Sequence, residues 1–158
     1  MSSSIILANR FREVILSGSW IANTNYRHAL DGMDYRIANA KVNGCNTIAV
    51  LAQHIHYYIH GLNNFFETSN LDIKDKFSFD FDIINSQQEW DTFLNQFWND
   101  AEIFAKNVES FDEAKLNSNF VKPEYGTFLR NIDGMIEHSY YHLGSNYIIK
   151  KNNIIAKK

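Results

Sequence analysis

The chain has 158 residues, of which 45% are hydrophobic and 15% aromatic, and its net charge is −3. This length suits one domain with a proper core, and the composition excludes a disordered chain. No basic patch is present, so we do not expect nucleic-acid binding. No stretch approaches the roughly 18 apolar residues of a membrane helix, so we expect no membrane partner.

Cys45 is the only cysteine. An intramolecular disulfide and a cysteine-based zinc site are therefore excluded. Arg10, Arg12 and Glu13 interrupt the only apolar run near the N-terminus, so no signal peptide is predicted. A reducing, cytoplasmic setting is the expectation that follows.

The spacing of apolar residues predicts a first helix from Ile5 to about Asn25, with one stripe at intervals of three and four residues: Leu7, Phe11, Val14, Gly18 and Ile21. Gly18 weakens a helix interior by roughly 1 kcal/mol relative to alanine. We attribute it to the close approach of a neighbouring helix. His28 follows the stripe and is expected at the surface.

Residues 29–45 form a connection, with a short helical turn expected around Tyr35–Ala40. The Asn43-Gly44 pair is typical of a turn. Asn46 is the predicted cap of the next helix.

A second helix is predicted from Thr47 to about Glu67, and it carries three histidines. At about 100° per residue, His54 lies roughly 80° from the centre of the apolar stripe, His56 roughly 120° and His60 roughly 160°. His54 is therefore the histidine expected to reach the protein interior. His56 and His60 form a rival metal-binding pair, but their position favours a solvated face.

Residues 68–85 show no helical stripe. The alternation from Phe77 to Asp82 is typical of a strand, but no partner strand is evident, so we predict an extended loop whose phenylalanines pack over one end of the helices. Ser86 and Glu89 form a capping box that begins a third helix, ending at about Glu109. Its aromatic stripe is interpreted as core.

Residues 110–122 are a polar linker, and Pro123 suits the first turn of a helix. A fourth helix is predicted from Glu124 to about Lys151. It contains His138 and His142, which lie four residues apart and so on one face. Two imidazoles so placed can bind one metal ion, although a catalytic metal site requires a third ligand.

Four amphipathic helices with long connections between the first and second and between the second and third predict an all-α, four-helix bundle in one domain, residues 1–158. In such a bundle one histidine of the second helix and the pair on the fourth could meet in space. Three neutral imidazoles would leave a divalent ion an open position.

Two segments resemble the DinB-like, YfiT-like superfamily of metal-dependent enzymes: residues 46–55, NTIAVLAQHI, and residues 136–144, IEHSYYHLG. The resemblance covers nearly the whole chain in helix order and spacing. By position it implies that His54, His138 and His142 are the metal ligands. The chain departs from the family at Ser145-Asn146, where Gln and an aliphatic residue are common, which could alter a contact behind the ligands or a substrate wall.

The resemblance further implies a divalent metal ion, zinc, nickel or iron, and a small-molecule substrate. Members of the family include transferases that use low-molecular-weight thiols such as bacillithiol, mycothiol or glutathione, and their domains often pair as homodimers. A thiol S-transferase or a hydrolase is therefore the expected function. No general base is identified, because Glu137 points about 100° away from His138 on a helix.

Two other interpretations are open at this point. The chain could be a metal-binding bundle without catalysis, serving binding or a stress response. Alternatively, its histidines could bind no metal and be solvated or hydrogen-bonded. Retention of stability and activity after alanine substitution of His54, His138 and His142 would favour the last interpretation.

Overall fold

The structure, a computed structural model, describes residues 2–42 and 44–155. Within those residues the fold is all-α, as predicted, and the only strand-like pairing is an isolated bridge between Asn119 and Thr127. The elements in chain order are α1 (Ser3–Arg12), the π-helix η1 (Glu13–Ser17), α2 (Tyr26–Leu30), α3 (Tyr35–Ala38), α4 (Ile48–Thr68), the 3-10 turn η2 (Asp75–Phe77), α5 (Gln87–Glu109), α6 (Glu113–Asn117), the 3-10 turn η3 (Pro123–Tyr125) and α7 (Phe128–Ile155).

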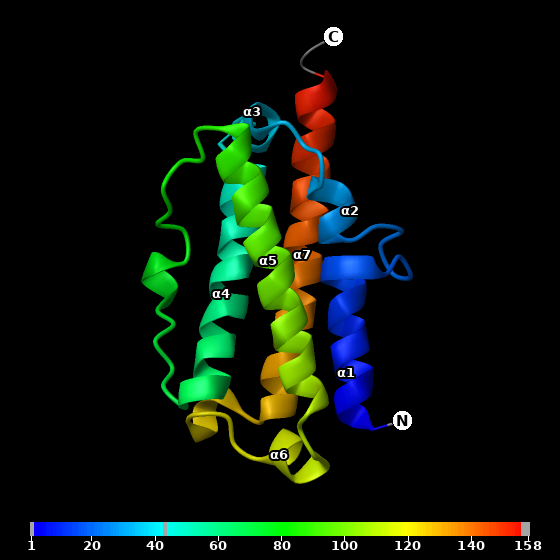
Figure 1. Ribbon diagram of the computed structural model, residues 1–158, viewed down its shortest axis with the longest axis vertical. Coiled ribbons are helices and arrows are strands. Elements are labelled where there is room, and N and C mark those ends of the chain that lie inside the picture. Colours follow the sequence, from blue (N-terminus) through cyan, green and yellow to red (C-terminus); the bar gives the residue numbers. More distant parts are fainter. Residues whose placement is uncertain (1, 43, 156–158) are drawn as a thin grey trace.

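The longer helices run side by side along the long axis of the molecule (Figure 1). Helix α1 packs against α5 and α7, and α4 packs against the same two helices. Apolar stripes from all of them meet in a shared core, where the rings of Phe11 in α1 and Phe104 in α5 lie 4.4 Å apart. Because α4 contacts both α5 and α7, side chains on two of its faces are buried. His54 and the pair His56 and His60 of α4 can therefore each contact a neighbouring helix.

The predicted first helix is too long. It ends at Ser17 after the π-helical turn, and Gly18 is extended, with φ −96° and ψ 171°. A Cβ on Gly18 would lie 2.1 Å from Cγ of Glu13, so the close approach involves the last turn of the same segment and not a neighbouring helix. Asn25 donates its side-chain amide to the Gly18 carbonyl at 2.7 Å, and Ile21 is exposed. The intervening loop therefore bends back towards the helix end.

The connection that follows contains α2 and, at the predicted helical turn, α3. Gly44 has φ +76°, a conformation that favours glycine, whereas Asn43 of the predicted turn lies outside the described residues. The cap of α4 is Thr47 and not Asn46. The Thr47 hydroxyl accepts a hydrogen bond from the Val50 amide at 3.2 Å, which satisfies one of the unpaired donors of the first turn.

Apart from η2, residues 69–85 form neither helix nor strand, in line with the predicted loop, but they do not pack over an end of the helices. The segment runs along the length of α4 (Figure 1). The ring of Phe79 stacks on His54 with centroids 4.0 Å apart and planes 9° apart. The expectation failed because alternation gives no information about which part of the fold an unpaired segment covers.

The predicted capping box begins α5: the Ser86 hydroxyl accepts from the Glu89 amide at 3.1 Å, while the Glu89 carboxylate accepts from the amide of Asn85, at 2.7 Å. The polar linker contains α6, which was not predicted. The fourth predicted helix starts later than expected, at Phe128, because Gly126 at φ +74° interrupts the chain and the Thr127 hydroxyl caps the first turn. The long α7 then carries His138 and His142.

Among the described residues, no helix combines the length and apolar character needed to cross a membrane.

Candidate metal centre

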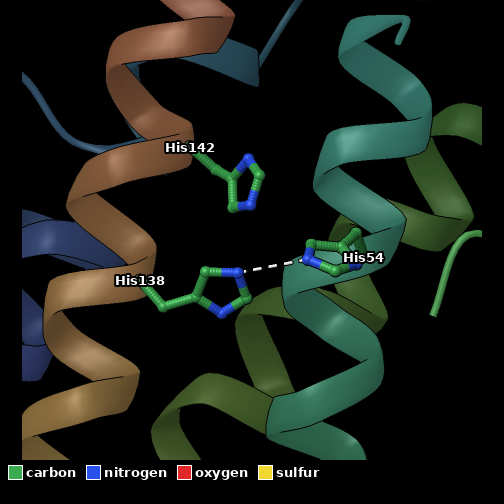
Figure 2. A group of neighbouring side chains, drawn as sticks. All are labelled: His54, His138 and His142. Atoms are coloured by element: carbon green, nitrogen blue, oxygen red, sulfur yellow. Dashed lines mark hydrogen bonds between the residues drawn. The ribbon is translucent and has the colours of Figure 1, made fainter. Parts of the chain in front are cut away.

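Three imidazoles meet between α4 and α7. His54 extends from α4, and His138 and His142 extend from successive turns of α7 towards it (Figure 2). The ring centroids are 5.0 Å apart for His54 and His138, 4.9 Å for His54 and His142, and 4.7 Å for the α7 pair. One nitrogen of each ring lies within 4.8 Å of the others, so the group could hold a metal ion.

The orientation of His54 is fixed from behind by the extended segment. Its Nδ1 lies 2.7 Å from the Ser78 carbonyl oxygen, which can only accept a hydrogen bond. Nδ1 therefore carries the proton, and in the neutral ring Nε2 presents its lone pair towards α7. A backbone carbonyl behind a ligating histidine is a usual partner, because it fixes both the tautomer and the ring plane. Phe79 covers one face of the same ring.

The site favours neutral imidazoles. Burial lowers the pKa of His54 below the ordinary 6.5. Burial and then repulsion by His54 lower the pKa of His138. Burial, followed by repulsion from the other two rings, lowers the pKa of His142 to about 4. A metal ion binds deprotonated imidazole, so all three rings are in the binding form near neutral pH.

The nitrogen positions fit a metal ion. His54 Nε2 and His138 Nε2 lie 3.1 Å apart, and because Nδ1 carries the proton of His54, the Nε2–H of His138 donates to His54 Nε2. Two nitrogens bound to one tetrahedral zinc at 2.0–2.1 Å would be about 3.3 Å apart. A divalent cation could therefore take the place of that proton with a small adjustment of the rings, the proton of His138 moving to its Nδ1. His142 Nδ1 is buried without a hydrogen-bond partner in the described structure, so that nitrogen has no protein acceptor or donor that would compete with an ion.

A cavity of about 570 Å³ opens beside His138. Its wall includes Tyr58 of α4, Asp75 of η2 and Arg130 of α7. The Tyr58 hydroxyl donates to the Asp75 carboxylate at 3.0 Å, and burial raises the pKa of Tyr58. If the three imidazoles held an ion, a small molecule in this cavity would lie close to the ion and to the Asp75 carboxylate.

Sequence reasoning missed Tyr58 and Asp75 as members of this site. Tyr58 follows His54 by one helical turn, so the spacing within α4 could have indicated it. Asp75 precedes and Ser78 belongs to the alternating run from Phe77 to Asp82, and this alternation does not place either residue beside α4. Glu137 is exposed and pairs with Arg130 at 2.9 Å, in agreement with its predicted surface position.

The two residues that depart from the family pattern lie outside the cavity wall. The Ser145 hydroxyl donates to the Tyr141 carbonyl within α7, at 3.2 Å. Asn146 is buried one turn beyond His142, and neither polar atom of its side chain has a hydrogen-bond partner in the described structure. Neither Ser145 nor Asn146 lines the cavity beside His138.

The prediction that His56 lies on a solvated face of α4 is wrong. The side chain of His56 is 13% exposed and that of His60 is 50% exposed, and both contact Asp100 of α5. His28 is exposed, as predicted. The structure thus separates the histidines of α4 into one that faces α7 and two that approach α5.

Comparisons of the chain with models of protein families, with curated proteins and with solved structures found no match.

Proposed function

We propose that the chain is a metal-dependent enzyme of the DinB-like, YfiT-like kind, in which α1, α4, α5 and α7 form a four-helix bundle. His54, His138 and His142 would hold one divalent ion, and the substrate would be a small molecule bound in the adjoining cavity. The observation that carries the proposal is the convergence of three imidazoles, one of which, His138, lines a cavity of about 570 Å³.

Zinc, nickel and iron all accept imidazole ligands and are the candidates for this ion. When bound, such an ion lowers the pKa of a coordinated thiol or water and so supplies a nucleophile near neutral pH. The three protein ligands leave a position open, as in catalytic metal sites. Thiol S-transfer and hydrolysis are the two reaction classes that this chemistry supports.

The residues of the cavity suit these reactions. Asp75 can accept the proton of a thiol or water held in the cavity, and its hydrogen bond from Tyr58 orients the carboxylate. In S-transfer the sulfur then forms a bond to an electrophilic carbon, and the leaving group departs with its electron pair. Arg130 offers a guanidinium at the same wall, which suits the carboxylates of a low-molecular-weight thiol such as glutathione.

A turnover assay tests this proposal. Tag-free protein loaded with zinc, nickel or iron(II) is incubated either with glutathione and a chlorinated aromatic electrophile, or with an activated ester in the absence of thiol. We expect turnover of one probe, its loss on chelation with the helical circular dichroism retained, and a reduction of 10²–10⁴-fold in Asp75→Asn, the usual contribution of a general base. Bound metal without turnover of either probe would favour a non-catalytic metal-binding or stress-response bundle.

The proposal includes a homodimer, with the exposed side chains of Trp20, Ile21 and Ile148 as candidates for its interface. Light scattering of the tag-free protein measures the mass directly. A monomer at micromolar concentration would remove this part of the proposal without affecting the metal site.

A further inference from the structure

A second group of potential metal ligands lies between α4 and α5. His56 Nε2 is 2.8 Å and His60 Nδ1 is 3.0 Å from the same carboxylate oxygen, Oδ2 of Asp100. The ligand atoms of the three residues all lie within 4.8 Å of one another. His56 and His54 are two residues apart, so their side chains point roughly 200° apart around α4. The second group is therefore separate from the centre between α4 and α7.

The carboxylate of Asp100 is in an unusual environment. Its side chain is only 12% exposed, and within the described residues its ion-pair partners are two imidazoles, with no lysine or arginine among them. A buried carboxylate is costly unless it is paired or coordinates a metal. The rings of Phe93 and Phe97 lie 5.5 Å from the ring of His56 and form an apolar wall behind it. Low polarity on that side strengthens attraction between the carboxylate and a cation.

The separations suit one ion. Two ligand atoms at about 2.1 Å from an ion and at right angles to each other are about 3.0 Å apart. The oxygen–nitrogen distances of 2.8 and 3.0 Å match adjacent positions around an octahedral or five-coordinate ion. Each imidazole can present a lone pair there once its proton moves to the other ring nitrogen. Two imidazoles with one carboxylate are a donor set for zinc, cobalt, nickel or iron(II), whereas magnesium and calcium prefer oxygen ligands.

Neighbouring contacts hold this geometry in place and leave access to it. Asn63 donates its side-chain amide to the Asp100 carbonyl at 2.8 Å, which fixes α4 and α5 relative to each other at this level. A surface cavity of about 330 Å³ reaches both His60 and Asp100, and Glu67 is also in its wall. An ion at this position would therefore have an entry path and room for water ligands.

We propose that His56, His60 and Asp100 form a second divalent-metal site, which takes a zinc-class transition-metal ion and clamps α4 to α5. The site is independent of the function proposed above, because it shares no ligand with the centre between α4 and α7. The competing explanation is a purely hydrogen-bonded group, in which two neutral imidazoles donate to Asp100. Asp100→Asn separates the two, because an amide oxygen still accepts those hydrogen bonds but replaces an anionic metal ligand with a neutral one.

The experiment starts from tag-free, chelator-treated protein in which His138→Ala and His142→Ala remove the first site. This background variant is titrated with Zn²⁺ by calorimetry, and its melting temperature is measured with and without the ion. We expect one equivalent of bound zinc, and at a free zinc concentration one hundred times the dissociation constant a rise of roughly 5–10 °C in melting temperature. Adding His60→Ala or Asp100→Asn should reduce zinc affinity more than about a hundredfold, beyond the loss typical of a residue that only supports a ligand.

His60 is half-exposed, so His60→Ala should fold, and circular dichroism verifies this. His28→Ala removes an exposed histidine outside both groups and should leave the one equivalent of zinc bound by the background variant unchanged. If the background variant binds no zinc, or if its zinc is retained after both His60→Ala and Asp100→Asn, the proposal is overturned. His60→Ala in the otherwise native chain tests the first site separately, because there one equivalent should remain at His54, His138 and His142.

Discussion

The contact between Gly61 of α4 and Ile73 of the extended segment gives the sharpest structural prediction. A Cβ added to Gly61 would lie 2.5 Å from Cγ1 and 2.9 Å from Cδ1 of Ile73. Ordinary contact between carbon atoms begins near 3.5 Å, so either the Ile73 side chain has to rotate or the segment that carries it has to move by about 1 Å. The same segment carries the Ser78 carbonyl that orients His54. If the segment moves, Gly61→Ala should disturb the metal centre, although Gly61 contacts none of its three histidines.

Two effects oppose each other in this variant. Alanine favours a helix interior over glycine by about 1 kcal/mol. Overpacking of a well-filled contact costs about 1–3 kcal/mol. We therefore expect Gly61→Ala to reduce the free energy of unfolding by up to about 2 kcal/mol, whereas Gly144→Ala in α7, where nothing lies within 4 Å of the added Cβ, should raise it by about 1 kcal/mol. Loosening of the carbonyl behind His54 should lower zinc affinity by about 10–100-fold.

Urea unfolding and a zinc competition titration measure the two effects. The double variant Gly61→Ala with Ile73→Ala removes the clashing side chain, so it should be more stable than the sum of the single changes predicts and should regain zinc affinity. If Gly61→Ala is stabilised as much as Gly144→Ala and binds zinc with unchanged affinity, the contact between Gly61 and Ile73 does not act as described.

The remaining predictions concern pH, an ion-pair network and the core. Burial lowers the pKa of all three histidines, that of His142 to about 4. Zinc affinity, measured by competition titration, should therefore fall far less between pH 7.5 and 5.5 than the roughly thousandfold loss expected for three histidines of ordinary pKa, and a loss of that size would contradict this. Arg12 binds Glu102 and Glu109 and lowers the pKa of both carboxylates below 4.5. Arg12→Met should therefore reduce the free energy of unfolding by about 1 kcal/mol near pH 7. In urea unfolding repeated well below pH 4.5, where both carboxylates are protonated, this difference from the native chain should vanish. Phe104→Ala should cost about 3–5 kcal/mol in the same measurement, because the ring is fully buried, and a loss under 1 kcal/mol would show that it does not pack as described.

Helical periodicity predicted the parts of the fold in which local pattern and packing agree. The stripe of α5 and the capping box at Ser86 and Glu89 gave its bounds closely, because an apolar face and a local cap act within the same few residues. The ends of α1 and the start of α7 were wrong. The π-helical turn before Gly18 and the left-handed Gly126 depend on contacts and backbone geometry that periodicity does not encode.

The histidines of α4 were likewise predicted correctly in one case and wrongly in another. His54 was correctly expected in the interior from its angle to a single apolar stripe. His56 was misjudged by the same reasoning, because α4 packs against α5 as well as α7, and its buried arc is wider than one stripe indicates. The role of Asp100 could not be predicted from the sequence, because a single acidic residue in a helix with an aromatic stripe is usually explained by a place on the solvent-exposed face. The contacts of His56 and His60 with Asp100 become evident only when the positions of α4 and α5 in the fold are known.

Metal content is the measurement that tests the central claim most directly. Tag-free protein saturated with zinc, and then desalted, is analysed by mass spectrometry on the His60→Ala background, which removes a ligand of the second group. We predict close to one zinc per chain, absent after His142→Ala and retained after His28→Ala, with the helical circular dichroism unchanged. Zinc content near zero in the His60→Ala protein, or equal in all three proteins, would contradict a metal centre at His54, His138 and His142.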